Sequence, residues 1–171
     1  MIDDQIKKKA VDLASKNFAE ALSCSESVFY ALICTDIIDV PEECVAMATA
    51  FGGGIALSGN TCGALIAAEM ALGSIWGFKN PYSMTMEQRQ WIPRNLKLRR
   101  FNNLVQDFKS EFESVNCQEI CDSNGFYGSD KCKDICRKIV PYITGRVIDY
   151  INIDEKTGDT MPYGYNIMNL K

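Results

Sequence analysis

Residues 61–77 read TCGALIAAEMALGSIWG, and this stretch decides the fold class. Glu69 is its one charged side chain, and apolar or small residues occupy nearly every face of the helix that the pattern predicts. A helix that is apolar all round is buried by its neighbours, and small side chains let those neighbours approach closely. We therefore predict that this helix begins after Thr61, ends near Gly77 and lies at the centre of an all-α bundle.

Glu69 would be costly to bury without a partner, because a carboxylate loses its hydration there. An ion pair with Arg99 or Arg100 is the interpretation that we favour. An acid/base role for Glu69 is the alternative.

Three helices are predicted before this segment. Residues 4–22 place apolar side chains at three- and four-residue spacings. Residues 23–26 form a capping box, which starts a second helix that ends near residue 36. Pro41 starts a third helix that runs to about residue 51, because proline is favoured in a first helical turn.

Two long helices are predicted after it. One spans residues 86–112 with an interruption at Pro93, and the other runs from residue 130 to about residue 151 with a kink at Pro141. Residues 154–171 lack helical periodicity. The predicted architecture is a single-domain bundle of about six helices over residues 1–153, followed by an irregular C-terminal tail over residues 154–171.

The composition excludes several classes of function. The 171 residues are 47% hydrophobic and 23% charged, and the net charge of −4 gives no electrostatic reason to bind nucleic acid or an anionic membrane. Residues 44–68 carry no charge, but glycines and polar residues interrupt the run, so we expect no membrane span. The N-terminus lacks the apolar core of a secretory signal, which predicts a cytoplasmic protein.

Eight cysteines and no histidine are the most informative feature of the composition. The lack of histidine excludes mixed Cys/His zinc sites, His-ligated haem and every Ser-His or Cys-His catalytic arrangement. A chain of this size does not need disulfide staples in a reducing compartment. Metal binding or redox chemistry is therefore the better interpretation of the cysteines.

Three cysteines each follow a residue that can cap a helix, and the pairs are Ser23-Cys24, Thr61-Cys62 and Asn116-Cys117. In a first helical turn, unpaired N–H groups and the helix dipole lower a thiol pKa and favour anions. This setting suits a nucleophilic thiolate or a metal-bound thiolate. The alternative is that these cysteines only fill space in the core.

Four cysteines form two pairs at i and i+4, namely Cys117 with Cys121 and Cys132 with Cys136. Each pair shares one helical face. The spacing differs from the C-x-x-C of zinc ribbons and thioredoxin-like motifs. The other two cysteines, Cys34 and Cys44, have apolar neighbours and are predicted to pack in the core.

Four segments carry a resemblance to a known family: SCSESV at residues 23–28, FGGGI at 51–55, CGALIAA at 62–68, and Asn116-Cys117 with the later Cys136. Together they resemble the C-GCAxxG-C-C family of redox-active proteins, which is named for four characteristic cysteines. Ala67 stands where the family motif usually has glycine. The resemblance covers residues 22–139 and implies a small helical protein linked with transport or electron transfer.

A domain similar to this family occurs in split-Soret-type cytochromes, where an iron–sulfur cluster accompanies the haems. This chain has no C-x-x-C-H haem attachment site, so only the cluster carries over. The leading hypothesis is a protein for electron transfer or redox sensing with a [2Fe–2S] or [4Fe–4S] cluster. The family pattern and the cap setting point to four ligands, Cys24, Cys62, Cys117 and Cys136, with Cys121 or Cys132 as substitutes.

Two other hypotheses stay open. The first is a metal-free thiol–disulfide oxidoreductase in which Cys24 or Cys62 attacks and another cysteine resolves. The second is a non-catalytic module that holds structural zinc through four cysteines, Cys117, Cys121, Cys132 and Cys136. The sequence does not decide whether the protein is an enzyme, and it does not identify a redox partner protein.

The tail contains apolar residues that bear on the oligomeric state of the protein, including Met161, Ile167 and Leu170. An exposed apolar segment of this length promotes association, and docking it on a second subunit would bury it. We therefore expect a homodimer. The competing interpretation is that the tail folds back on its own bundle.

Overall fold

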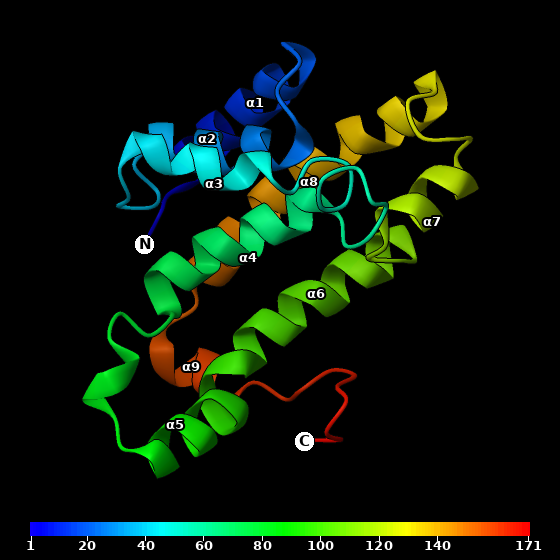
Figure 1. The fold of residues 1–171 in the computed structure, drawn as a ribbon. Helices are drawn as coiled ribbons and strands as arrows, with labels where there is room; N and C mark the ends of the chain where they lie inside the picture. The colour runs from blue at the N-terminus through cyan, green and yellow to red at the C-terminus, as the bar shows by residue number, and fades with distance from the viewer.

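The computed structural model describes all 171 residues, which form helices and no β-sheet. Helix α4 (Gly63–Trp76) lies between α2 (Cys24–Cys34) and α8 (Asp130–Asn152) (Figure 1). Helix α1 (Asp4–Ala19) packs on α2 and α8, and α6 (Leu98–Phe112) borders α4 and α8. The prediction of an all-α bundle is confirmed.

The central position of α4 follows from its small residues. Half of its residues are fully buried, namely Gly63, Ala64, Leu65, Ala67, Ala68, Ala71 and Leu72. Glycine and alanine occupy most of these positions, so α2 and α8 can approach the α4 backbone closely. The helices enclose one contiguous core of 27 buried residues.

The N-terminal helices begin where the capping residues predict. The side chain of Asp3 caps α1, and Ser23 and Glu26 form the predicted capping box of α2. The predicted third helix is shorter than expected, because residues 42–49 divide into a 3-10 helix, η1 (Glu42–Val45), and α3 (Ala46–Thr49).

Proline acts differently at its two helical positions. After a short 3-10 helix η2 (Pro81–Ser83), residues 86–112 form α5 (Met86–Ile92), a π-helical turn η3 (Pro93–Lys97) and α6. The interruption predicted at Pro93 is thus confirmed, since proline has no N–H to continue the α-helical hydrogen bonds. Helix α8, by contrast, continues through Pro141.

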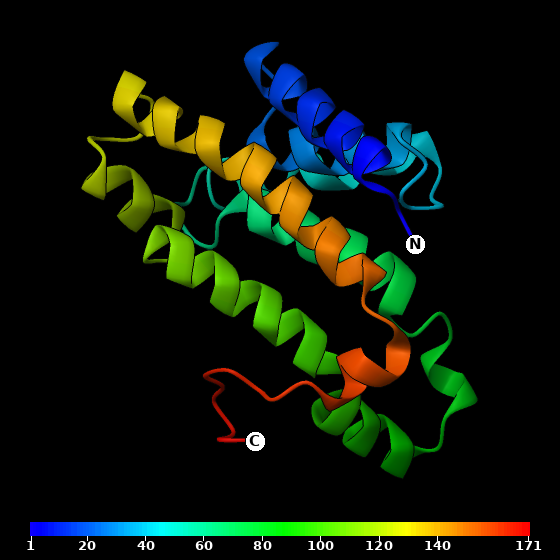
Figure 2. The ribbon, with the colours of Figure 1, turned by 180° about the vertical axis from the view of Figure 1, so that it is seen from behind.

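The tail is less irregular than the sequence predicts. It contains a short helix, α9 (Glu155–Thr160), which Asp154 caps. The rest of the tail runs along α6 of its own chain (Figure 2). Side chains of α6 donate hydrogen bonds to tail carbonyls, from Arg99 to Met161 and from Asn103 to Pro162. The tail therefore folds back on its own bundle, although Ile167 stays 93% exposed.

Arg100 is buried and joins α6 to the end of α8. Its guanidinium donates hydrogen bonds to the carbonyls of Tyr150, Ile153 and Asp154 and stacks over the ring of Trp76. The prediction that Glu69 forms an ion pair with Arg99 or Arg100 is wrong. Both guanidiniums donate hydrogen bonds to backbone carbonyls instead.

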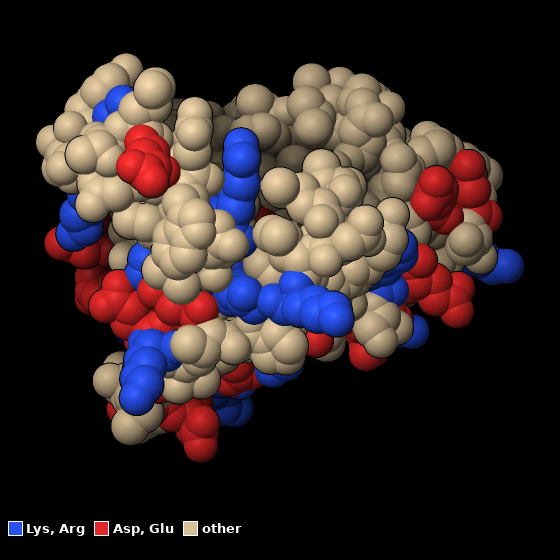
Figure 3. All heavy atoms as spheres, turned by 90° about the horizontal axis from the view of Figure 1, so that it is seen from below, with Lys and Arg blue, Asp and Glu red and all other residues tan.

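No helix of the structure is both long and apolar enough to cross a bilayer. The surface at the end of the molecule that contains α5 and α9 carries Lys and Arg side chains interspersed with Asp and Glu (Figure 3). Between η3 and α9, Lys97 forms ion pairs with Glu155 and Asp159.

Candidate four-thiol site

Four cysteines from four helices meet at one end of the bundle. Cys24 is the first residue of α2, Cys62 occupies the N-cap of α4, Cys117 is the first residue of α7 (Cys117–Ser123), and Cys136 lies in the second turn of α8. These are the four ligand candidates of the sequence. We call them the four-thiol site.

A cavity of about 500 Å³ opens onto this site. Three of the four cysteines, Cys24, Cys117 and Cys136, line it. Leu57 and Tyr127 also line the cavity, and both side chains are well exposed, so the cavity reaches the surface. The fourth cysteine, Cys62, does not line it and is 5% exposed.

The glycine-rich segment 51–61 precedes α4 and forms one wall of the cavity, which Gly52, Gly53, Ala56 and Leu57 line. Its end is tied to α7, because the amide of Cys117 donates to the carbonyl of Asn60. The amide of Cys62 donates in turn to the carbonyl of Val115. Two segments that are more than fifty residues apart in the sequence therefore hold Cys62 and Cys117 side by side.

Glycine is needed where this wall touches the cysteines. A Cβ atom at Gly54 would lie 2.6 Å from the Cβ of Cys117. One at Gly63 would overlap the backbone carbonyl of Phe51 and would also lie 3.2 Å from the Sγ of Cys24. Gly54 also has a φ of 72°, in the left-handed region that favours glycine. The FGGGI and CGALIAA motifs thus leave the room in which the thiols lie.

The same segment contains backbone strain. Ile55, Ala56 and Leu57 have φ values of 63°, 50° and 62°. A left-handed conformation costs roughly 1–2 kcal/mol for each residue with a Cβ, and it is rarest for a β-branched residue such as isoleucine. Strain of this kind persists only where the surrounding structure enforces it, and it is concentrated at functional sites.

Burial controls the charge of the four thiols. It raises the pKa of Cys24 and Cys117, and it raises that of Cys136 to about 12, with further increases at Cys117 and Cys136 from neighbouring cysteines. The pKa of Cys62 is also raised, by burial first and by Cys24 and Cys117 after it. These mutual effects reflect how closely the thiols lie.

The cap setting lowers the thiol pKa values less than the sequence predicts. At Cys24 the amides of Gly53, Ser25 and Ala64 lower the pKa, but burial outweighs them. The predicted net lowering is therefore wrong for Cys24, Cys62 and Cys117. The sequence also places Cys62 one position too far along, since Cys62 is itself the N-cap residue of α4.

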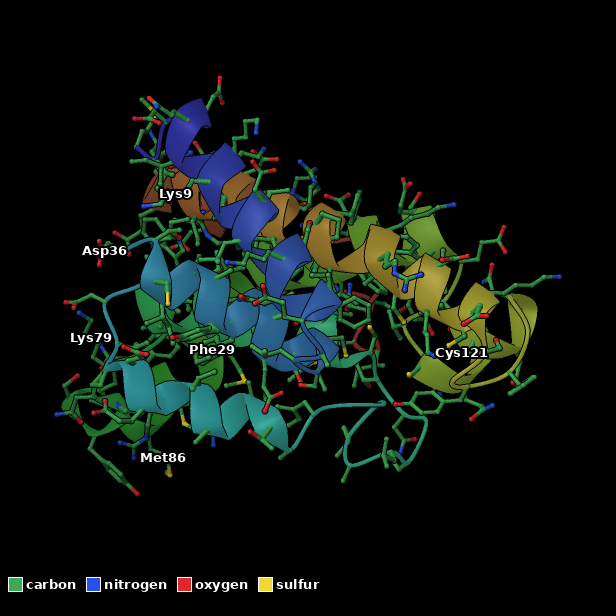
Figure 4. The ribbon with its side chains drawn as sticks, turned by 90° about the horizontal axis from the view of Figure 1, so that it is seen from above. Lys9, Phe29, Asp36, Lys79, Met86 and Cys121 are labelled. Carbon is green, nitrogen blue, oxygen red and sulfur yellow. A yellow bond between two sulfur atoms is a disulfide. The ribbon has the colours of Figure 1, made fainter.

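Cys121 and Cys132 are joined in a disulfide that links α7 to α8, with 4.9 Å between their Cα atoms (Figure 4). No disulfide is expected from the sequence. Two of the four thiols proposed for a structural zinc site are thus bonded to each other, and the substitute ligands Cys121 and Cys132 are not free thiols in this state.

The remaining cysteines lie outside the site. Cys34 is exposed and Cys44 is partly exposed. The prediction that they pack in the core is wrong for Cys34, because the last residue of α2 faces outward although its neighbours in the sequence are apolar.

Two other residues at the cavity were not found from the sequence. Tyr127 lies in the loop between α7 and α8, and its pKa is raised by burial and then by Cys117, Cys24 and Cys136. Lys133 follows the disulfide cysteine Cys132 and lines the same cavity. The sequence contains no local signal for either, since their position beside the cysteines depends on how the loop and α8 pack against α2 and α7.

The comparisons with known proteins identify the family. A family profile described as "Putative redox-active protein (C_GCAxxG_C_C)" matches residues 22–149. No curated protein and no solved structure matches the chain. Because the family match covers most of the 171 residues and includes all four cysteines of the site, the chain belongs to the C-GCAxxG-C-C family of redox-active proteins.

Proposed function

We propose that this protein binds an iron–sulfur cluster, [2Fe–2S] or [4Fe–4S], through Cys24, Cys62, Cys117 and Cys136, and serves cytoplasmic electron transfer or redox sensing. One observation carries the proposal: four cysteines from separate helices, all inside the family match, lie together, three of them lining one cavity and Cys62 buried beside Cys24 and Cys117. Core packing alone gives no reason for four thiols to share one site.

The donor set fits such a cluster. Four thiols without histidine are the usual ligands of [2Fe–2S] and [4Fe–4S] clusters. As the side chains stand, no three Cys, Asp or Glu groups have the arrangement that holds a single metal ion. A cluster distributes its ligands over two or more irons, so its thiolates are further apart than those of one zinc ion.

The protein's own groups would set the properties of the site. The backbone amides of Gly53 and Ala64 lower the pKa of the Cys24 thiol, so they favour its anionic form. Amides near a thiolate ligand and burial both tune the reduction potential of thiolate-bound iron. When bound, the cluster would supply one-electron chemistry. The iron would also supply the positive charge without which four buried thiolates repel one another.

One observation favours a metal-free thiol–disulfide oxidoreductase as the second candidate. A disulfide, Cys121–Cys132, already lies beside the free thiols. The raised pKa values of Cys24 and Cys62 oppose this function, because a protonated thiol is a poor nucleophile at neutral pH. The iron–sulfur proposal therefore has the stronger support.

Anaerobic reconstitution with iron and sulfide tests the proposal. We expect a brown protein with iron and acid-labile sulfide in equal amounts and a visible absorption that dithionite bleaches. Cys62→Ser should lose the colour and most of the iron, because one of four ligands is removed. Cys34→Ser is the matched control and should keep both, since Cys34 is exposed and lies outside the site.

A colourless, iron-free wild-type protein after reconstitution would contradict the iron–sulfur proposal. One zinc per chain without iron would favour the structural module instead. A redox partner protein and a homodimer, in which a second subunit covers the exposed tail, belong to the same proposal.

A further inference from the structure

The disulfide and the four-thiol site share the hairpin of α7 and α8. Cys117 lies one turn before Cys121 on α7, and Cys136 lies one turn after Cys132 on α8. Cys117, Cys132 and Cys136 all line the cavity. The disulfide is therefore next to the site and yet uses neither of its two nearest ligand candidates.

The two sulfurs of the disulfide differ in their access to the cavity. Both cysteines are almost fully buried, at 2% exposed for Cys132 and 1% for Cys121. Only Cys132 lines the cavity, so a molecule in the cavity meets Cys132 and not Cys121. Lys133 lines the cavity beside Cys132, and its ammonium group lies 3.8 Å from Asp130 in an exposed ion pair that a ligand carboxylate can replace.

We propose that Cys121 and Cys132 form a second redox site, a dithiol–disulfide couple that exchanges with small acidic thiols through the sulfur of Cys132. A cavity of about 500 Å³ has the size of a small-molecule site. Its single lysine favours a thiol that carries a carboxylate. The proposal goes beyond the iron–sulfur function and does not depend on it.

The exchange proceeds in two balanced steps. The thiolate of the small molecule attacks Sγ of Cys132, the Cys121–Cys132 bond breaks, and Cys121 leaves as a thiolate that takes up a proton. A second small thiol then attacks the mixed disulfide and releases Cys132 as a thiol. Two small thiols are oxidised to their disulfide while the Cys121–Cys132 pair is reduced, and the oxidised small molecule reverses both steps.

Reduction of the Cys121–Cys132 disulfide would also affect the four-thiol site. Helix α7 has seven residues and is joined to α8 by a loop and by this disulfide. Reduction removes the covalent link between the helices that carry Cys117 and Cys136. This consequence, unlike the exchange itself, matters only if the four-thiol site binds its cluster.

A pair of matched variants tests the asymmetry of access, with glutathione disulfide as the probe. Cys121→Ser leaves Cys132 as a free thiol on the cavity wall, and Cys132→Ser leaves Cys121 away from it. Both metal-free variants are incubated with the probe, quenched in acid and mapped by peptide mass spectrometry. We expect the adduct on Cys132 to form at least about tenfold faster than the adduct on Cys121, because the rate depends on access to the attacked sulfur.

Wild-type protein provides the second measurement and does not depend on how the variants fold. Metal-free native protein is equilibrated with reduced glutathione or dithiothreitol, quenched in acid, and only then unfolded, alkylated with N-ethylmaleimide and mapped. We expect Cys121 and Cys132 to be reduced while the protein is still folded, with the mixed glutathione disulfide on Cys132.

A pair that stays oxidised until the protein is unfolded would overturn the proposal, as would equal adduct rates in the two variants. Because no iron is present, neither result bears on the iron–sulfur function, and a failed reconstitution would leave this exchange intact.

Discussion

Glu69 and the four site cysteines share one physical situation, since burial penalises the charged form of each. For Glu69, burial raises the pKa from its ordinary value of 4.5 to about 8, and one carboxyl oxygen is buried without a hydrogen-bond partner. The folded protein therefore holds a proton at Glu69 over a pH range in which the unfolded chain has released it.

The pH dependence of stability should carry the signature of Glu69. The folded pKa is raised, so its contribution is fully present below about pH 4.5 and is lost as the pH rises toward 8, by up to about 4 kcal/mol. Glu69→Met should remove this slope and be more stable than wild type at pH 8. Urea unfolding between pH 5 and 8 measures it, and an unchanged slope in the variant would show that Glu69 is not the responsible group.

The left-handed backbone of residues 55–57 allows a test by glycine substitution. Ala56 is exposed, so Ala56→Gly removes little packing but relieves a strained φ of 50°. We expect a gain in the free energy of unfolding of about 0.5–1 kcal/mol. Ala68→Gly in the middle of α4 should do the opposite and cost about 1 kcal/mol or more. Loss of stability in both variants would mean that the segment is not strained.

At the scale of elements, Arg100 is the buried polar link between α6 and the end of α8, beside a second link in which Asp107 of α6 accepts from Arg146 and Tyr150 of α8. Three carbonyls near the end of α8 accept hydrogen bonds from its guanidinium, at 2.6, 2.7 and 2.8 Å. The last carbonyls of any helix lack partners within it, so this side chain completes α8. Gly158 lies directly against the guanidinium, where a Cβ would not fit.

Arg100→Met should therefore destabilise the fold strongly. It keeps the apolar stem but leaves buried carbonyls unsatisfied, and we expect a loss of about 3–5 kcal/mol. Arg94→Met is the matched control on the neighbouring turn, where the arginine is exposed, and it should change stability by less than about 0.5 kcal/mol. Thermal unfolding compares the two variants, and similar effects would contradict the role assigned to Arg100.

At the scale of the whole molecule, the tail decides how much apolar surface is exposed. Hydrogen bonds fix it to α6, including one from Gln106 to the carbonyl of Tyr165. Tyr165 and Ile167 nevertheless stay 77% and 93% exposed, and Leu98 on α6 is 46% exposed. Exposed apolar side chains gathered in this way favour association with another surface.

We expect the full chain to be a homodimer that the tail helps to form. A chain that ends at Thr160 keeps α9 and the ion pair of Asp159 with Lys97, and it should be a monomer. Ile167→Asp should weaken the dimer without such a deletion, because it puts a charge in the interface. Light scattering at micromolar concentration measures all three masses, and a monomeric mass for the full chain would end the proposal.

The sequence by itself determined the fold class and the main helices, and it proposed a set of candidate cysteines. Capping at Ser23, the break at Pro93 and the small residues of α4 act on near neighbours, so they can be read along the chain. The family motifs also selected Cys24, Cys62, Cys117 and Cys136 before any contact was known.

Only the tertiary structure decided what depends on distant contacts. It placed backbone carbonyls beside Arg99 and Arg100 and left Glu69 without a partner. It joined Cys121 to Cys132, and it reversed the expected pKa shift of the capped thiols. Desolvation and disulfide formation depend on which segments surround a side chain in space, and spacing along the sequence does not contain that information.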